Sequence, residues 1–114
     1  MYRVNIINNI KEGKTISGFD WELLLEQSTL EQDCIILSAE ASRVQATLVI
    51  FYFDKKYYSA VASEAFVSSR LIFEDQKATP LSLEFLSFLY WVSGDYPLLE
   101  FLRKNQEKEA KDNA

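Results

Sequence analysis

The stretch over residues 43–73 constrains the fold most, because its long runs of aromatic and branched residues are separated by one short polar break. It reads RVQATLVIFYFDKKYYSAVASEAFVSSRLIF, and the break is Asp54-Lys55-Lys56. This pattern is typical of a β-hairpin that continues into a meander. We expect a strand over 43–53, a partner strand after the break, and a last strand over 65–73. In that last strand the inward side chains are Val67, Leu71 and Phe73, and the outward ones Ser68 and Arg70.

The length of the loop decides the register of the hairpin. A two-residue loop at Asp54-Lys55 pairs Phe53 with Lys56. The other pairs are then Tyr52/Tyr57, Ile50/Ser59 and Leu48/Val61 on one face, and Phe51/Tyr58 and Val49/Ala60 on the opposite face. Asp-Lys is not a favoured type I′ pair, so a longer loop that shifts the register by one and exchanges the faces is the alternative. In either register, both faces are apolar near the tip.

The chain before the hairpin predicts two strands and one helix. Alternation over residues 2–7 indicates a short edge strand, and the apolar run over 33–39 indicates a second strand that ends in a turn at Ala41-Ser42. A helix is expected from about Trp21 to Ser28, with Asp20 as its N-cap. Its outer face carries the acidic residues Glu22 and Glu26.

Two helices are predicted after the hairpin. Thr79 caps the first, Pro80 occupies its first position, and Gly94 ends it. This helix is apolar nearly all round, which indicates a place at the centre of the core. Asp95 caps the second helix, whose inward residues are Leu98, Leu99, Phe101 and Leu102. From about residue 104 the chain is polar, and its charge spacing allows the helix to continue before it frays.

These elements predict one α+β domain over residues 1–114. A mostly antiparallel meander of four to five strands packs against a C-terminal helical hairpin. The single short N-terminal helix lies on the other side of the sheet or at its end.

The composition excludes several kinds of function. The chain has no histidine, one cysteine and three scattered glycines, so we expect no catalytic residues, no metal site and no cofactor. With 17 acidic and 12 basic residues the net charge is −5. Direct nucleic-acid binding is therefore disfavoured, since it depends on Lys and Arg at phosphates. A basic protein partner suits this charge, although acidity also serves solubility.

Cys34 lies in a predicted strand, where a small core residue is a better interpretation than a redox-active thiol. A single unpaired cysteine suits a reducing compartment. The first residues show no signal peptide, and the longest apolar segment is too short to span a bilayer. We therefore expect a cytoplasmic protein without a membrane partner.

The candidate contact surface is the aromatic cluster at the hairpin tip, which we call the hairpin aromatics: Phe51, Tyr52, Phe53, Tyr57 and Tyr58. Two interpretations stay open, a thick core between helices or an exposed patch for a protein partner. Because the helix at Trp21 has only a narrow apolar stripe, we expect some of these side chains to remain accessible. The acidic residues Glu22, Glu26 and Asp54 are expected around them. Trp91 joins the set because it continues the polar stripe of its helix, although packing in the core is the favoured interpretation for it.

These features predict a non-enzymatic protein-binding module. The first hypothesis is a small acidic inhibitor of the immunity-protein, antitoxin or phage-antagonist type, which masks a basic partner such as a toxin or nuclease. The alternative is a self-associating structural or assembly subunit, a homodimer for example, that buries its hairpin against another copy. A third class, a catalytic or small-molecule-binding domain, requires an apolar pocket with converging polar groups, for which the sequence has no signal.

Overall fold

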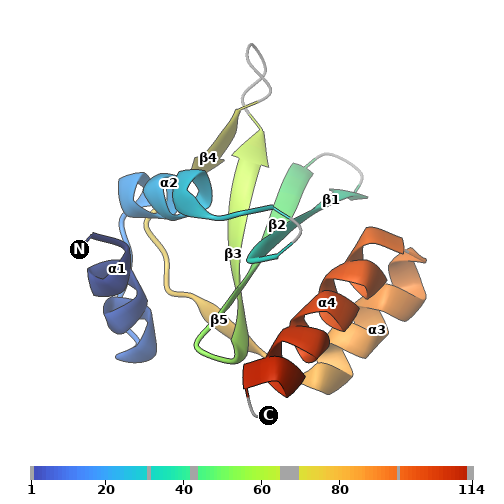
Figure 1. Ribbon diagram of the computed structural model, residues 1–114. Helices are drawn as coiled ribbons and strands as arrows, with labels where there is room; N and C mark the ends of the chain where they lie inside the picture. The colour runs from blue at the N-terminus through green and yellow to red at the C-terminus, as the bar shows by residue number, and fades with distance from the viewer. Residues whose placement is uncertain (1, 31, 42–43, 65–69, 95, 113–114) are drawn as a thin grey trace.

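The computed structural model describes residues 2–30, 32–41, 44–64, 70–94 and 96–112 (Figure 1). The helices are α1 (Tyr2–Lys11), α2 (Gly18–Gln27), α3 (Leu83–Ser93) and α4 (Tyr96–Asp112). The strands are β1 (Cys34–Ala41), β2 (Val44–Phe53), β3 (Lys56–Glu64), β4 (Leu71–Phe73) and β5 (Thr79–Leu81). They form an antiparallel sheet with the order β1-β2-β3-β4, and β5 pairs with β3 as well. The predicted α+β architecture is confirmed.

The β2–β3 hairpin has the register of the two-residue loop. Phe53 pairs with Lys56 and Tyr52 with Tyr57, so the first prediction is confirmed and the shifted register is wrong. Asp54 and Lys55 have φ angles of 53° and 60°, the positive values that a type I′ turn requires. Aspartate tolerates this conformation better than most residues, and here its carboxylate also forms an ion pair with Lys11 at 3.0 Å.

Helices cover both faces of the sheet (Figure 1). One apolar cluster joins α1 and α2 to Val49, Phe51, Phe53, Tyr58 and Ala60 of the hairpin. The other joins α3 and α4 to Ile35, Ile50 and Tyr52. The predicted division of hairpin side chains between two faces is confirmed, as is the helical pair on one of them.

The expected edge strand over residues 2–7 is wrong, because this segment is the helix α1. Its buried residues are Ile6 and Ile10, which lie one helical turn apart, whereas Tyr2 and Val4 are half exposed. The alternation that suggested a strand covers too few residues to compete with this i,i+4 pair. The helix ends near Gly13, which adopts a φ of 74° that suits glycine.

Two helix starts also differ from the prediction. Ser17, not Asp20, is the N-cap of α2, and its hydroxyl accepts a hydrogen bond from the Asp20 N–H at 3.1 Å. Ser82 is the N-cap of α3, so a start at Thr79-Pro80 is wrong. That dipeptide instead belongs to β5 and pairs with Tyr58 and Ser59 at the edge of β3. A proline without an N–H is compatible with an edge strand, and only the tertiary pairing distinguishes it from a helix start.

Other predicted boundaries have mixed outcomes. The stop of α3 at Gly94 is confirmed, with a φ of 58° at the C-cap, and Pro97 lies in the first turn of α4. Of the inward residues predicted on α4, Leu98 and Phe101 are buried and Leu102 is half-buried, whereas Leu99 is exposed and its inward prediction is wrong. Predictions on Ser42, Val67, Ser68 and Asp95 lie outside the described residues.

Trp21 anchors α2 to the sheet. Its fully buried ring stacks on Phe51 and Phe73, with centroid distances of 5.7 and 6.2 Å. Its indole N–H donates to the Gln76 carbonyl at 3.3 Å. At the start of the same helix, a Cβ on Gly18 would lie 2.1 Å from the Phe73 carbonyl oxygen. The missing side chain therefore lets the helix approach β4 closely.

Gln76 fills a gap between the two short strands on one edge of β3. Strand β4 pairs with residues 62–64 of β3 and β5 with residues 57–59, which leaves Ala60 and Val61 between them. The Gln76 side chain accepts from the Val61 N–H at 2.9 Å and donates to the Val61 carbonyl at 2.7 Å. Its backbone forms an isolated bridge with Ile16. One amide side chain thus replaces a missing strand residue.

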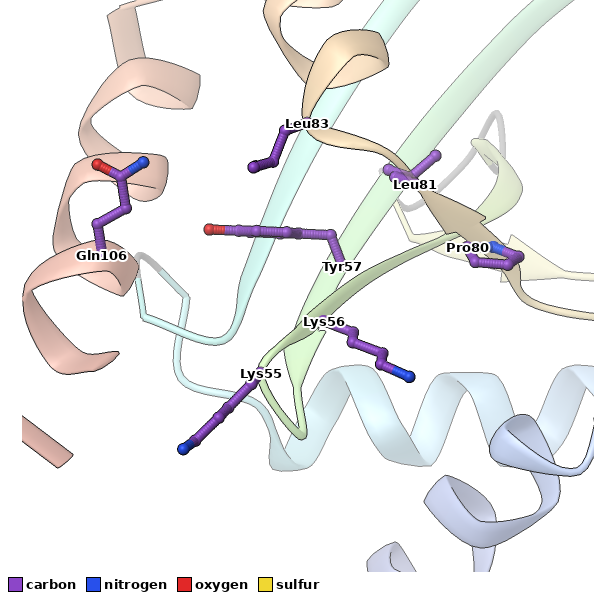
Figure 2. A pocket seen from close by; sticks show the side chains of 7 residues that line it. All are labelled: Lys55, Lys56, Tyr57, Pro80, Leu81, Leu83 and Gln106. Atoms are coloured by element: carbon purple, nitrogen blue, oxygen red, sulfur yellow. The ribbon is translucent and has the colours of Figure 1, made fainter. Parts of the chain in front are cut away.

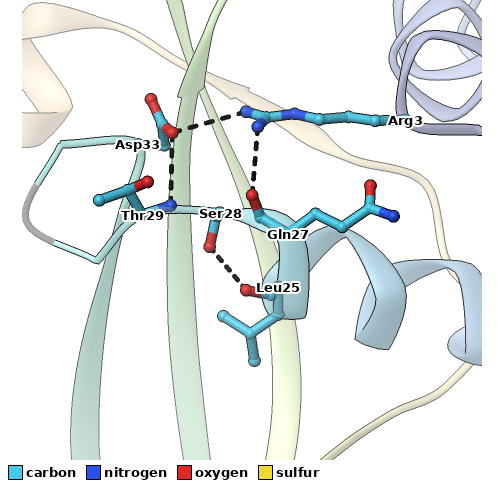
Figure 3. A network of polar contacts seen from close by, with 6 residues as sticks. All are labelled: Arg3, Leu25, Gln27, Ser28, Thr29 and Asp33. Carbon is cyan, nitrogen blue, oxygen red and sulfur yellow. Dashed lines mark hydrogen bonds and ion pairs between the residues drawn. The ribbon is translucent and has the colours of Figure 1, made fainter. Parts of the chain in front are cut away.

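A polar network ties α1 to the end of α2 and the start of β1 (Figure 3). The Arg3 guanidinium donates to the Gln27 carbonyl at 3.3 Å and lies 3.7 Å from the Asp33 carboxylate. Asp33 also accepts from the Thr29 N–H at 3.4 Å. A cation at the carboxyl end of a helix complements its unpaired carbonyls, so Arg3 helps to hold α1 over the sheet.

We predict that Gly18→Ala destabilises the protein by about 1–3 kcal/mol, because the new Cβ cannot avoid a backbone oxygen. In an open helix position the same change would stabilise by up to about 1 kcal/mol. Urea unfolding measures the difference. Phe19→Ala, in the same helix but exposed, is the control and should stay within about 0.5 kcal/mol of wild type. A stabilised Gly18→Ala protein would contradict the close approach.

Gln76→Ala should cost about 1–2 kcal/mol, since two hydrogen bonds to the Val61 backbone are lost. Hydrogen exchange should show faster exchange of the Val61 amide in this variant. The neighbouring change Lys77→Ala, at an exposed side chain, serves as control. Equal Val61 exchange in both variants would show that the side-chain bridge does not protect the strand.

Candidate functional site

The hairpin aromatics are mostly core residues. Phe51, Tyr52, Phe53 and Tyr58 are buried and Tyr57 is half-buried, so the expectation of accessible side chains is wrong for four of the five and the interpretation as a thick core is the outcome for them. The reason is α1, a segment expected to be a strand, which adds Ile6 and Ile10 over that face. The rings of the hairpin aromatics pack on each other. The ring centroids are 4.7 Å apart for Phe53 and Tyr58 and 4.8 Å apart for Tyr52 and Tyr57.

The acidic residues predicted around these aromatics are engaged within the molecule or lie apart. Glu22 pairs with Arg70 at 2.7 Å and Asp54 with Lys11 at 3.0 Å. Glu26 is exposed on α2. Helix α2 and Trp91 on α3 lie on opposite faces of the sheet, so the structure does not bring the predicted contact residues together (Figure 1).

A different surface stands out, on α3 and the start of α4. Its large apolar side chains are exposed, and we call the set the α3–α4 apolar surface: Leu83, Phe85, Phe88, Trp91, Val92, Tyr96 and Leu99. Trp91 is 79% exposed and Phe88 55%. The favoured interpretation of Trp91 as a core residue is therefore wrong, and the alternative, that its side chain reaches the surface, is confirmed. The expectation that α3 is central to the core is wrong as well.

The packing order of the two C-terminal helices explains this exposure. Helix α4 contacts β1, and α3 lies against α4 on the side away from the sheet (Figure 1). Among the described residues of α3, Leu86 alone is fully buried. It lies in a cluster with Leu98 and Phe101 of α4. Leu89 and Tyr90 are half-buried against the same cluster, and the large apolar residues on the opposite side of α3 face outward. A helix that is apolar all round is expected to make contacts on every side. The sequence does not show which side packs within this chain and which side is left exposed.

Charge is sparse on this surface. Between Lys77 and Arg103 the sequence has no basic residue, and its acidic residues are Glu84, Asp95 and Glu100. Glu100 pairs with Arg103 at 2.7 Å. Glu84 is thus the single charged residue of α3. Such a surface favours apolar contact over electrostatic recognition.

Two shallow hollows border the surface. The first, of about 280 Å³, is lined by Lys55, Lys56, Tyr57, Pro80, Leu81, Leu83 and Gln106. Figure 2 shows the Tyr57 ring extending between Leu83 and Gln106, while the two lysine ammonium groups point away from each other and from the ring. The second, of about 350 Å³, lies between α3 and α4 and is lined by Ser87, Tyr90, Leu99, Leu102, Arg103 and Gln106. Neither lining set contains a carboxylate or a thiol.

Cys34 is buried at the start of β1. Burial raises the pKa of its thiol to about 12; the Asp33 carboxylate adds to the rise, and a hydrogen bond with Ser28 opposes it. A thiol held neutral in this way is a poor nucleophile, which agrees with a packing role.

Comparison with known proteins found no matching family model, no similar curated protein and no similar solved structure. In the described part of the chain, no three potential metal-binding side chains lie together. Across the same residues, every helix is too short or too polar to cross a membrane.

The pH dependence of stability should report the neutral state of Cys34. Its folded pKa lies above the ordinary value of 9.0, so its contribution is complete below about pH 9 and is lost as the pH rises toward 12. Between pH 8 and 10.5 wild type should lose about 1–2 kcal/mol more than Cys34→Ala, as measured by urea unfolding. Cys34→Ala is the control, because its tyrosines and lysines titrate as they do in wild type. Parallel profiles of unfolding free energy against pH for the two proteins would contradict the raised pKa of Cys34.

Proposed function

We propose that this protein is a non-enzymatic protein-binding module and that the α3–α4 apolar surface is its contact surface. The exposure of Trp91 and Phe88 on one helix face carries the proposal. Large aromatic residues dominate the binding energy of protein interfaces, and here they lie on a regular helix that presents them in a fixed geometry. A helix face of this kind suits contact with another helix or an apolar groove.

The size of the surface supports the proposal. From ordinary side-chain areas, its seven residues expose on the order of 700–800 Å². A specific interface buries about 800 Å² on each partner, so this exposed area, spread over α3 and the start of α4, is of the size that an interface uses. Left in water, a surface of this size favours aggregation, so a binding partner is the physical reason for keeping it.

The small acidic inhibitor stays one form of the proposal, with its contact moved from the hairpin to α3. In that form the partner has an apolar centre and basic residues at the rim, opposite Glu84 and Glu100. We include a cytoplasmic location in this proposal, because the free thiol of Cys34 suits a reducing compartment. The self-associating subunit is the other form, and there the same surface meets another copy.

Photo-crosslinking in the producing cells tests the contact surface in both forms. A photoreactive phenylalanine analogue replaces Phe88 in one variant and Phe19 in the control, which is a similarly exposed phenylalanine on α2. Irradiation should give a protein adduct of one defined mass from position 88 and none from position 19. Absence of an adduct at 88, or equal adducts at both positions, would contradict the proposal.

A further inference from the structure

We infer that the occupant of the α3–α4 apolar surface is a second copy of this chain, paired through α3 about a two-fold axis near Phe88. This inference rests on the proposed function and names the partner. A closed two-fold pair covers the surface of both copies at once, whereas an open-ended contact would leave one of them exposed.

The positions on α3 are self-complementary about Phe88. In an antiparallel pair of helices with its axis at this residue, Phe88 meets Phe88 of the other copy. Within a residue of register, Phe85 then faces Val92 of the other copy, because the two lie on the same side at nearly equal distances from the axis. Apolar groups therefore meet apolar groups along the centre of the helix.

The single charge of α3 has a partner in this arrangement. Glu84 faces Trp91 of the other copy, where its carboxylate can accept a hydrogen bond from the indole N–H at the rim. The two Glu84 residues lie about 12 Å apart along the helix axes, given a rise of about 1.5 Å per residue. That separation exceeds the Debye length of about 8 Å at physiological salt, so their repulsion is screened.

The area agrees with a pair of copies. On α3, the apolar residues that face the other copy (Phe85, Phe88, Trp91 and Val92) expose on the order of 500 Å² per chain, which is the size of a small interface that dissociates on dilution. A basic partner would gain little from a surface with one acidic residue on its main helix. The net charge of −5 opposes pairing only weakly at physiological salt, because repulsion between charges more than about 8 Å apart is largely screened.

Sedimentation equilibrium over a dilution series tests the inference with the full chain. Wild type should be a dimer that dissociates on dilution, and Phe88→Glu should raise the dimer dissociation constant by about 100-fold or more, since both copies place the new charge at the axis. Phe19→Glu is the matched control and should leave it unchanged. Trp91→Glu is a second variant at a more exposed position, and circular dichroism checks that all variants fold.

Cysteine crosslinking tests the antiparallel register. Cys34 is buried, so an introduced cysteine is the reactive one. Phe88→Cys should form a disulfide between copies under mild oxidation, and Phe85→Cys should crosslink to Val92→Cys in a mixture more readily than either variant to itself. Phe19→Cys should not crosslink.

Each other outcome overturns the inference. A wild-type monomer at all concentrations, a dimer unaffected by Phe88→Glu, or open-ended oligomers would each exclude the two-fold pair through α3. The mass of the photo-crosslinked adduct distinguishes failure of this inference from failure of the proposed contact surface. An adduct of twice the chain mass supports self-pairing, whereas an adduct of any other mass supports the contact surface with a different partner and overturns the second copy.

Discussion

The structure depends on a β-hairpin that is apolar on both faces. Phe51 and Tyr58 project to one side of it and Ile50 and Tyr52 to the other, so neither side can be left in water. Burying apolar area is worth roughly 25 cal/mol per Å², and a single layer of helices covers only one face. The fold therefore has three layers, with α1 and α2 on one side and α3 and α4 on the other (Figure 1).

The two covering layers are not equivalent. On one side Trp21 inserts into the core, with its ring stacked on two phenylalanines and its N–H bonded to a carbonyl. On the other side α4 contacts the sheet, and α3 adds the buried Leu86 with the half-buried Leu89 and Tyr90. The opposite side of α3 is also apolar and is turned away from the core. The second layer covers the sheet but leaves large apolar side chains of α3 exposed to water. The proposed contact surface consists of these side chains.

Local patterns predicted the hairpin well, because its register depends on a two-residue turn and on residues close to it in sequence. The elements that were missed depend on distant partners. Helix α1 is defined by Ile6 and Ile10 packing on the hairpin, and β5 by the pairing of Pro80 with Tyr58. The candidate site failed for the same reason, since a missed helix buried the aromatics that had been expected at the surface.

The sequence by itself determined the strands of the hairpin, their apolar faces, the acidic charge and the absence of histidine. Only the tertiary structure decided which apolar residues are core and which are surface. The physical reason is that hydrophobicity sets how much a side chain gains from leaving water but not what it packs against. Leu86 and Trp91 belong to one helix with one apolar pattern, and the position of α4 buries the first and exposes the second.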